Sequence, residues 1–115
     1  EKNEKIKIYK RALALKTLEE LEELHNELED RFGKLKSEAK GFFEFLKIRI
    51  RARELGIVSI KEDKEKRLLI NFNEEKINVD KIIYLLANKK ISYLKFTQTI
   101  GFEGDIFEFF DLYSN

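Results

Sequence analysis

The sequence predicts an α+β fold, in which three N-terminal helices pack on a small mixed β-sheet with a crossover helix and a short C-terminal helix. Two features of the chain carry this prediction. Up to residue 55, apolar side chains recur at spacings of three and four residues, which is typical of helices that bury one face. From residue 57, the pattern changes to short runs rich in β-branched and aromatic residues. At 115 residues the chain fits one domain, so we expect residues 1–115 to form a single domain.

The first two helices are predicted from the signals at their ends. A basic helix is expected over residues 4–15, and Thr17 then begins the capping-box sequence Thr-Leu-Glu-Glu. The second helix should end near Phe32, because Gly33 can take a left-handed conformation without a Cβ clash. Its apolar residues lie three or four apart and form one stripe: Leu18, Leu21, Leu24, Leu28 and Phe32.

The third helix is expected to be the most buried of the three. It should begin at the N-cap Ser37 and end near Leu55, with Gly56 just beyond it. Apolar side chains surround much of its axis, which is typical of a central helix. We expect one face to form the core, and the residues that share it at successive turns are Phe42, Leu46 and Ile50.

The C-terminal half is expected to form the sheet. Ile57–Lys61 and Arg67–Phe72 predict a hairpin with a charged loop, and alternation over 93–96 predicts a third strand. A helix from the cap Asn78 to about residue 88 lies between strands, so we expect a right-handed crossover. The sequence Gly-Phe-Glu-Gly at 101–104 predicts a turn. The capping-box sequence Asp-Ile-Phe-Glu at 105–108 then begins a last helix, expected to dock on the sheet. The alternative for its many aromatic residues is an exposed patch for a partner.

The sequence offers few groups for catalysis. Cysteine is absent, which excludes disulfides, thiol nucleophiles and cysteine-ligated zinc. His25 is the one histidine, so a zinc site would lack a second imidazole. No glycine-rich loop suited to phosphate is present, because the clustered glycines 101 and 104 flank an acidic residue. We therefore expect a non-enzymatic chain without catalytic, cofactor-binding or metal-binding residues.

Two further features concern location and completeness. No apolar run approaches the ~20 residues that span a bilayer, so we expect a soluble intracellular protein with no membrane partner. The chain begins with glutamate rather than methionine, which suggests a fragment or a processed product.

The net charge of +1 conceals a strong asymmetry along the chain. Residues 17–30 carry seven acidic side chains and no lysine or arginine, whereas the basic segment 31–53 has a net charge of +6. Within the acidic segment, Glu23, Glu27 and Asp30 follow one another at helical spacing on the face opposite the apolar stripe. Asp30 also lies in the last turn of its helix, where the helix dipole disfavours a carboxylate.

This acidic surface has two interpretations. It is either a solvated face that the neighbouring basic helices neutralise, or a docking surface for a basic partner. The basic segment 31–53 supplies the alternative function, a small nucleic-acid-binding domain. Its basic residues at 47, 49, 51 and 53 point in different directions on a helix, so they do not form one patch. We therefore do not expect direct nucleic-acid binding.

Two motifs give the chain a family resemblance. Residues 27–33, Glu-Leu-Glu-Asp-Arg-Phe-Gly, are similar to the E-L-x-D-R-F-G signature of the C-terminal domain of the bacterial transcription-repair coupling factor (Mfd) family. Arg49, Ala52 and Leu55-Gly56-Ile57 resemble the R-x-x-A-x-x-L-G-I element of the same family. One departure concerns the loop after Gly33, where relatives carry a proline and this chain has Lys-Leu-Lys-Ser.

The resemblance implies an autoinhibitory domain of a larger bacterial, cytoplasmic protein. The parent would be an ATP-dependent DNA translocase that displaces stalled RNA polymerase and recruits nucleotide excision repair. Its C-terminal domain would dock on a UvrB-like module and mask the surface that binds UvrA. In the family, the glutamate and aspartate of the E-L-x-D motif contact the masked module, and they match Glu27 and Asp30. We therefore expect Glu27, Asp30 and the neighbouring Glu23 to bind that intramolecular partner.

Overall fold

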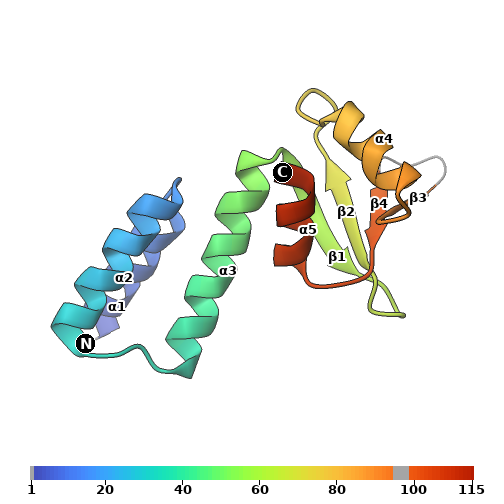
Figure 1. Cartoon of the computed structure of the whole chain (residues 1–115). Helices are drawn as coiled ribbons and strands as arrows, with labels where there is room; N and C mark the ends of the chain where they lie inside the picture. The colour runs from blue at the N-terminus through green and yellow to red at the C-terminus, as the bar shows by residue number, and fades with distance from the viewer. Residues whose placement is uncertain (1, 95–98) are drawn as a thin grey trace. The chain divides into compact units, whose positions relative to one another are not determined.

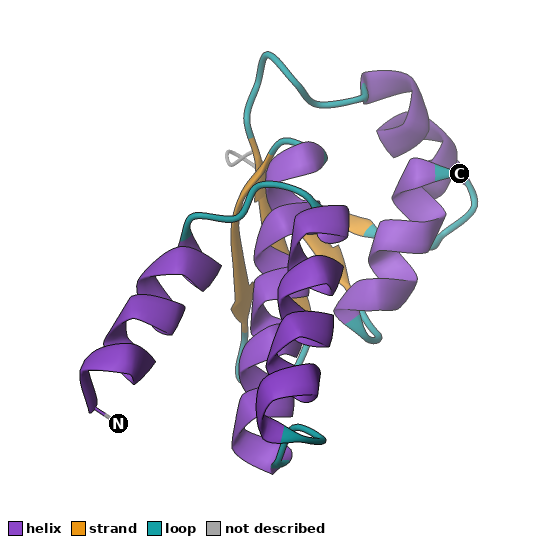
Figure 2. Cartoon of the chain, turned by 90° about the vertical axis from the view of Figure 1, so that its left-hand side faces the viewer, coloured by secondary structure: helices purple, strands orange, loops and turns teal. Residues whose placement is uncertain are grey.

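The computed structural model describes residues 2–94 and 99–115. This part of the chain contains five helices and four strands and divides into two compact units, residues 1–51 and 52–115. Figures 1 and 2 show that the first unit is helical and that the strands all belong to the second. The predicted α+β class, with three helices followed by a sheet, is confirmed.

The helices of the first unit are α1 (Lys2–Leu13), α2 (Leu18–Phe32) and α3 (Ser37–Glu54), the last of which extends past the unit boundary. The capping box at Thr17 is formed, because its hydroxyl accepts from the backbone N–H of Glu20 and the Glu20 carboxylate accepts from the backbone N–H of Thr17. Gly33 ends α2 at φ 83°, and its N–H donates to the carbonyl of Glu29 at 2.8 Å. Both predicted ends of α2 are therefore confirmed.

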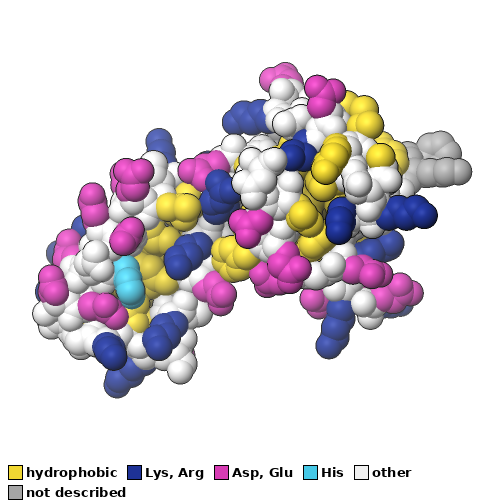
Figure 3. Space-filling model, viewed as in Figure 1, with side chains coloured by type: hydrophobic (Ala, Val, Ile, Leu, Met, Phe, Trp, Pro, Cys, Tyr) yellow, Lys and Arg dark blue, Asp and Glu magenta, His cyan; other side chains and the backbone are white. Residues whose placement is uncertain are grey.

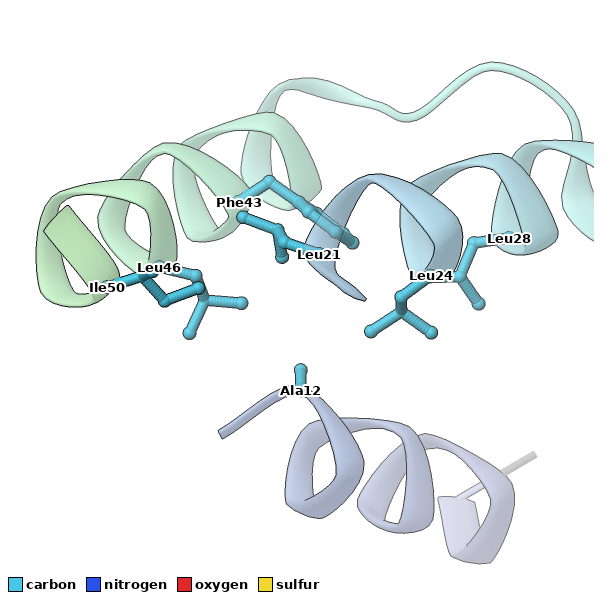
Figure 4. Packing of buried hydrophobic residues seen from close by; sticks show 7 residues of the cluster. All are labelled: Ala12, Leu21, Leu24, Leu28, Phe43, Leu46 and Ile50. Atoms are coloured by element: carbon cyan, nitrogen blue, oxygen red, sulfur yellow. The ribbon is translucent and has the colours of Figure 1, made fainter. Parts of the chain in front are cut away.

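The core of this unit lies between its three helices (Figure 4). The side chains that meet there are Ala12 of α1, Leu21, Leu24 and Leu28 of α2, and Phe43, Leu46 and Ile50 of α3.

Two expectations about this core need correction. Phe43 occupies the core position expected for Phe42, which is only partly buried at its edge. Phe32 is 59% exposed, because the last turn of α2 extends beyond the buried stripe, and the Arg31 guanidinium lies 4.9 Å from the centre of its ring.

The second unit contains β1 (Ile57–Glu62), β2 (Leu68–Phe72), α4 (Val79–Ala87), β3 (Ser92–Leu94), β4 (Thr99–Phe102) and α5 (Ile106–Ser114). The strand order is β1-β2-β4-β3, and each described pairing is antiparallel. The predicted hairpin is confirmed as β1 and β2.

We expected a mixed sheet, whereas each described strand pairing is antiparallel. β2 and β3 are each antiparallel to β4, so they run in the same direction, as a crossover through α4 requires. They do not pair with each other, because β4 lies between them. The turn expected at 101–104 begins inside a strand, because Gly101 and Phe102 belong to β4. Residues 95 and 96 of the predicted third strand lie outside the described residues.

Aromatic side chains of α5 pack on the sheet. Phe109 is fully buried, and its ring centre lies 6.2 Å from that of Phe72 in β2 and 5.4 Å from that of Phe102 in β4. Tyr113 is buried beside them, and its hydroxyl accepts from the backbone N–H of Asn78 at 2.7 Å. The predicted docking of the last helix on the sheet is therefore confirmed.

Replacing Gly56 with alanine should destabilise the second unit. Gly56 ends α3 at φ 76°, and an added Cβ would lie 2.6 Å from the Cβ of Lys76. A left-handed alanine costs about 1–3 kcal/mol, to which this contact adds. Gly41→Ala is the matched control, since no neighbouring atom lies within 4 Å of its Cβ position and alanine favours a helix. Urea denaturation would measure both; equal midpoints would contradict this account of Gly56.

Candidate interaction surface

The acidic surface lies on the outer face of α2, away from the core of the first unit. Its members, Glu23, Glu27 and Asp30, are held on a helix whose start is capped and whose opposite face is buried. Figure 3 shows acidic side chains gathered around the single histidine, His25. His25 lies at the edge of this surface, with its Nε2 3.5 Å from the Glu29 carboxylate and its ring 5.3 Å from that of Phe43.

Glu27 is not a free carboxylate, because α1 supplies a partner for it. Arg11 donates from Nη1 to Glu27 Oε2 at 2.7 Å and from Nη2 to Glu27 Oε1 at 2.9 Å. This two-pronged hydrogen bond holds the pKa of the Glu27 carboxyl below its ordinary value, and the positive charge of Arg31 acts in the same direction. Glu27 thus has a fixed orientation and a local cation.

A second ion pair joins the same two helices. The Arg31 guanidinium donates to the carboxylate of Glu4 on α1. Arg31 is the arginine of the D-R-F-G sequence, so this motif residue has a role within the unit. The two pairs hold α1 against α2, and the Arg11 pair does so through Glu27 of the acidic surface.

Asp30 and Glu23 are placed differently from Glu27. Both are exposed, and within residues 2–94 and 99–115 neither has a hydrogen bond or an ion pair. Asp30 follows the buried Leu28 by two residues, so its carboxylate points to solvent near the C-terminal end of the helix. The unfavourable position of Asp30 near the negative end of the dipole is therefore not offset within the described chain.

Three basic residues of α3 have no described ion pair with the acidic surface. Lys47, Arg49 and Arg53 are exposed, and the described ion pairs of α2 with arginine come from α1 and from Arg31 itself. Among the described residues, Glu27 is the member of the acidic surface that forms an ion pair.

Other possible sites are sparse in the part of the chain that the structure describes. A shallow depression of about 730 Å³ lies between α4 and α5, and another of about 540 Å³ lies along α1 next to Arg31. Among the described residues, no group of His, Asp and Glu is arranged to hold a metal ion. None of the described helices has the length and apolar character needed to cross a bilayer.

The titration of Glu27 tests whether the Arg11 pair persists in solution. Since Arg11 lowers the pKa of Glu27, the pair should stabilise the fold above the ordinary pKa of glutamate, and this contribution should vanish as the pH falls through the lowered value. Arg11→Gln should therefore raise the pKa of Glu27, as followed by NMR of its carboxyl carbon. Lys10→Gln removes a charge from the same helix without touching Glu27 and should leave it unchanged. If Glu27 titrates identically in both variants, the ion pair of Arg11 with Glu27 does not persist in solution.

Comparison with known proteins relates the chain to a family. A family model described as the TRCF domain matches residues 1–82. The chain is 36% identical over 107 residues to the transcription-repair-coupling factor of Escherichia coli, 36% over 88 residues to that of Borreliella burgdorferi, and 34% over 77 residues to that of Bacillus subtilis. These matches cover 86%, 74% and 67% of this chain, but only 9%, 8% and 6% of the three relatives.

Proposed function

The chain belongs to the TRCF domain family, and we propose on that premise that both of its units form the C-terminal regulatory domain of a transcription-repair coupling factor. The domain is non-catalytic. It docks on the UvrB-like module of its own parent protein and masks the surface of that module that binds UvrA. The parent is a cytoplasmic, ATP-dependent DNA translocase that displaces stalled RNA polymerase and recruits excision repair.

The observation that carries this proposal is the acidic surface of α2, on which Glu23 and Asp30 have no partner in the described chain. Residues 17–30 contain seven acidic residues and no lysine or arginine, and the described ion pair of Arg11 with Glu27 satisfies only part of that charge. Asp30 costs helix stability where it lies, and a cationic partner surface would offset that cost. An interaction role explains both the sign of the surface and the position of Asp30.

Glu27 and Asp30 have different tasks in this proposal. Their positions are three apart on one helix face, so their Cβ atoms are close enough for one partner surface to meet both. Arg11 fixes the Glu27 carboxylate in one orientation, and each of its oxygens keeps a lone pair for a further donor. Asp30 supplies a full charge with no partner to give up.

The direct test is binding of the 115-residue chain to the isolated UvrB-like module, measured by calorimetry. We expect binding that weakens with salt and with Asp30→Asn, because screening and neutralisation both remove the attraction. Asp111→Asn is the matched control, since it removes an exposed helical aspartate from α5. Absence of binding, or equal affinity of the two variants, would reject the docking surface.

A further inference from the structure

A second exposed surface lies on the first unit, and it is apolar. On α1, Ile6, Tyr9 and Leu13 fall three and four residues apart and are 46%, 43% and 43% exposed. On α3, Phe45 is 53% exposed. Helices of a small domain usually bury such a stripe, so large side chains aligned in this way mark an interaction surface.

Aromatic contacts connect the two helices across this surface. The ring of Tyr9 meets that of Phe42 edge-on, with 5.2 Å between centres, and Phe42 stacks with Phe45 at 6.4 Å. Phe42 in turn packs against the core of the unit. The apolar surface is therefore continuous from α1 to α3 and rests on buried side chains, which gives it a defined shape.

The charges around this surface are mostly positive. Glu4 is the one acidic residue of α1, and its ion pair with Arg31 turns it toward α2, while Arg11 is paired with Glu27. Four exposed lysines remain on α1: Lys2, Lys5, Lys7 and Lys10. The Lys5 ammonium lies 5.9 Å from the centre of the Tyr9 ring, and Arg49 is exposed one helical turn beyond Phe45. Glu38, one turn before Phe42, is an exposed acidic residue of α3 near this surface.

We propose that this α1–α3 surface binds an acidic amphipathic helix from another polypeptide segment. The apolar face of such a helix would lie along Ile6, Tyr9, Leu13 and Phe45. Its acidic residues would meet the lysines of α1 and Arg49. This surface is chemically opposite to the acidic face of α2, so the proposal does not depend on docking through Glu27 and Asp30.

The shape and chemistry favour a helix over a single-stranded nucleic acid. Side chains at i, i+3 and i+7 on one helix form a ridge that packs along a second helix. Nucleic-acid bases stack on aromatic rings, whereas Ile6 and Leu13 offer aliphatic side chains. The lysines alone would attract either ligand, so nucleic acid is a direct competitor in the test.

The probe is a fluorescein-labelled peptide of about 18 residues, long enough to form a helix, with leucine along one face and glutamate elsewhere. Fluorescence anisotropy would measure its binding to the 115-residue chain. A peptide with lysine in place of every glutamate and a labelled oligothymidylate are the competing probes. We expect the acidic peptide to bind, with an affinity that falls as salt rises, and to bind more tightly than both competitors.

Variants locate the site. Leu13→Glu and Phe45→Glu should each weaken binding of the acidic peptide at least about tenfold, because each puts a negative charge on the apolar surface that faces the acidic peptide. Ile83→Glu alters a comparably exposed residue of α4, 58% exposed, and should change affinity less than about twofold. Lys2→Glu and Lys10→Glu, at exposed positions outside the core, should also weaken binding and provide the test if the apolar variants unfold.

Three results would overturn the proposal. One is equal binding of the acidic and basic peptides. Another is loss of affinity in Ile83→Glu that matches the loss in Phe45→Glu. The third is tight binding of the oligothymidylate without binding of the acidic peptide, which would assign the surface to nucleic acid instead.

Discussion

Replacing Phe109 with alanine should lower the free energy of unfolding of the second unit by about 3–5 kcal/mol. The ring is fully buried, and its centre lies within 6.2 Å of those of Phe72, Phe102 and Tyr113. These three neighbours come from β2, β4 and α5, so the cavity would open where helix and sheet meet. Such a loss is a large share of the stability of a small unit. Urea denaturation followed by circular dichroism would measure it.

Phe45→Ala provides the matched control, because it removes the same atoms from a ring that is 53% exposed. We expect a much smaller change there, since less surface returns to water and no cavity forms. A similar loss in both variants would mean that Phe109 is not the centre of the core of the second unit.

The elements that the sequence predicted well are those with local signals. A threonine that accepts from a backbone N–H three residues later starts α2, and Asn78 starts α4 in the same way, with Lys81 as donor. Gly33 ends α2 at positive φ. Each signal acts within four residues, so it can be read without knowing the rest of the fold.

Strand β4 shows why other elements could not be predicted in this way. It contains Gly101, and glycine usually indicates a turn. In the sheet, Gly101 lies opposite Ser92, and a Cβ on it would come within 2.6 Å of the Ser92 hydroxyl oxygen. The glycine thus serves close packing between strands, a reason that exists only once the distant strands have paired.

The buried side of α3 was ambiguous for a related reason. Its aromatic residues surround the axis, so spacing alone does not decide which of Phe42 and Phe43 faces the core. Phe43 is buried because α2 packs against that side, with the His25 ring 5.3 Å away. The choice depends on the neighbouring helix rather than on α3.

The negative charge of the acidic surface and its location on α2 were predicted from the sequence, but the ion-pair partner of Glu27 was not. Arg11 lies 16 residues earlier in the chain, and the two meet only because α1 packs against α2. Sequence spacing carries no information about such a pair. The finding distinguishes the two motif acids, because Asp30, unlike Glu27, is without a partner in the described chain.

Reversing Asp30 to lysine should separate docking from folding. The side chain is exposed and without a described partner, and most surface substitutions change stability by less than about 0.5 kcal/mol. A lysine near the C-terminal end of α2 also suits the helix dipole. Docking should weaken far more, because breaking a charge pair at a partly desolvated interface costs about 2–5 kcal/mol. Glu27→Lys should reduce both docking and stability, because it removes the partner of Arg11 and places a like charge beside it.

The readout is capture of UvrA by the full-length parent protein, combined with thermal melts of the 115-residue chain. If the domain masks the UvrA-binding surface, the Asp30→Lys parent should capture UvrA without any activating step, while the melting temperature of the chain stays near that of the unchanged sequence. Asp111→Lys, the same reversal at an exposed aspartate of α5, should leave capture low. Equally low capture by Asp30→Lys and the unchanged parent, with the chain still folded, would mean that Asp30 does not hold the domain in its masking position.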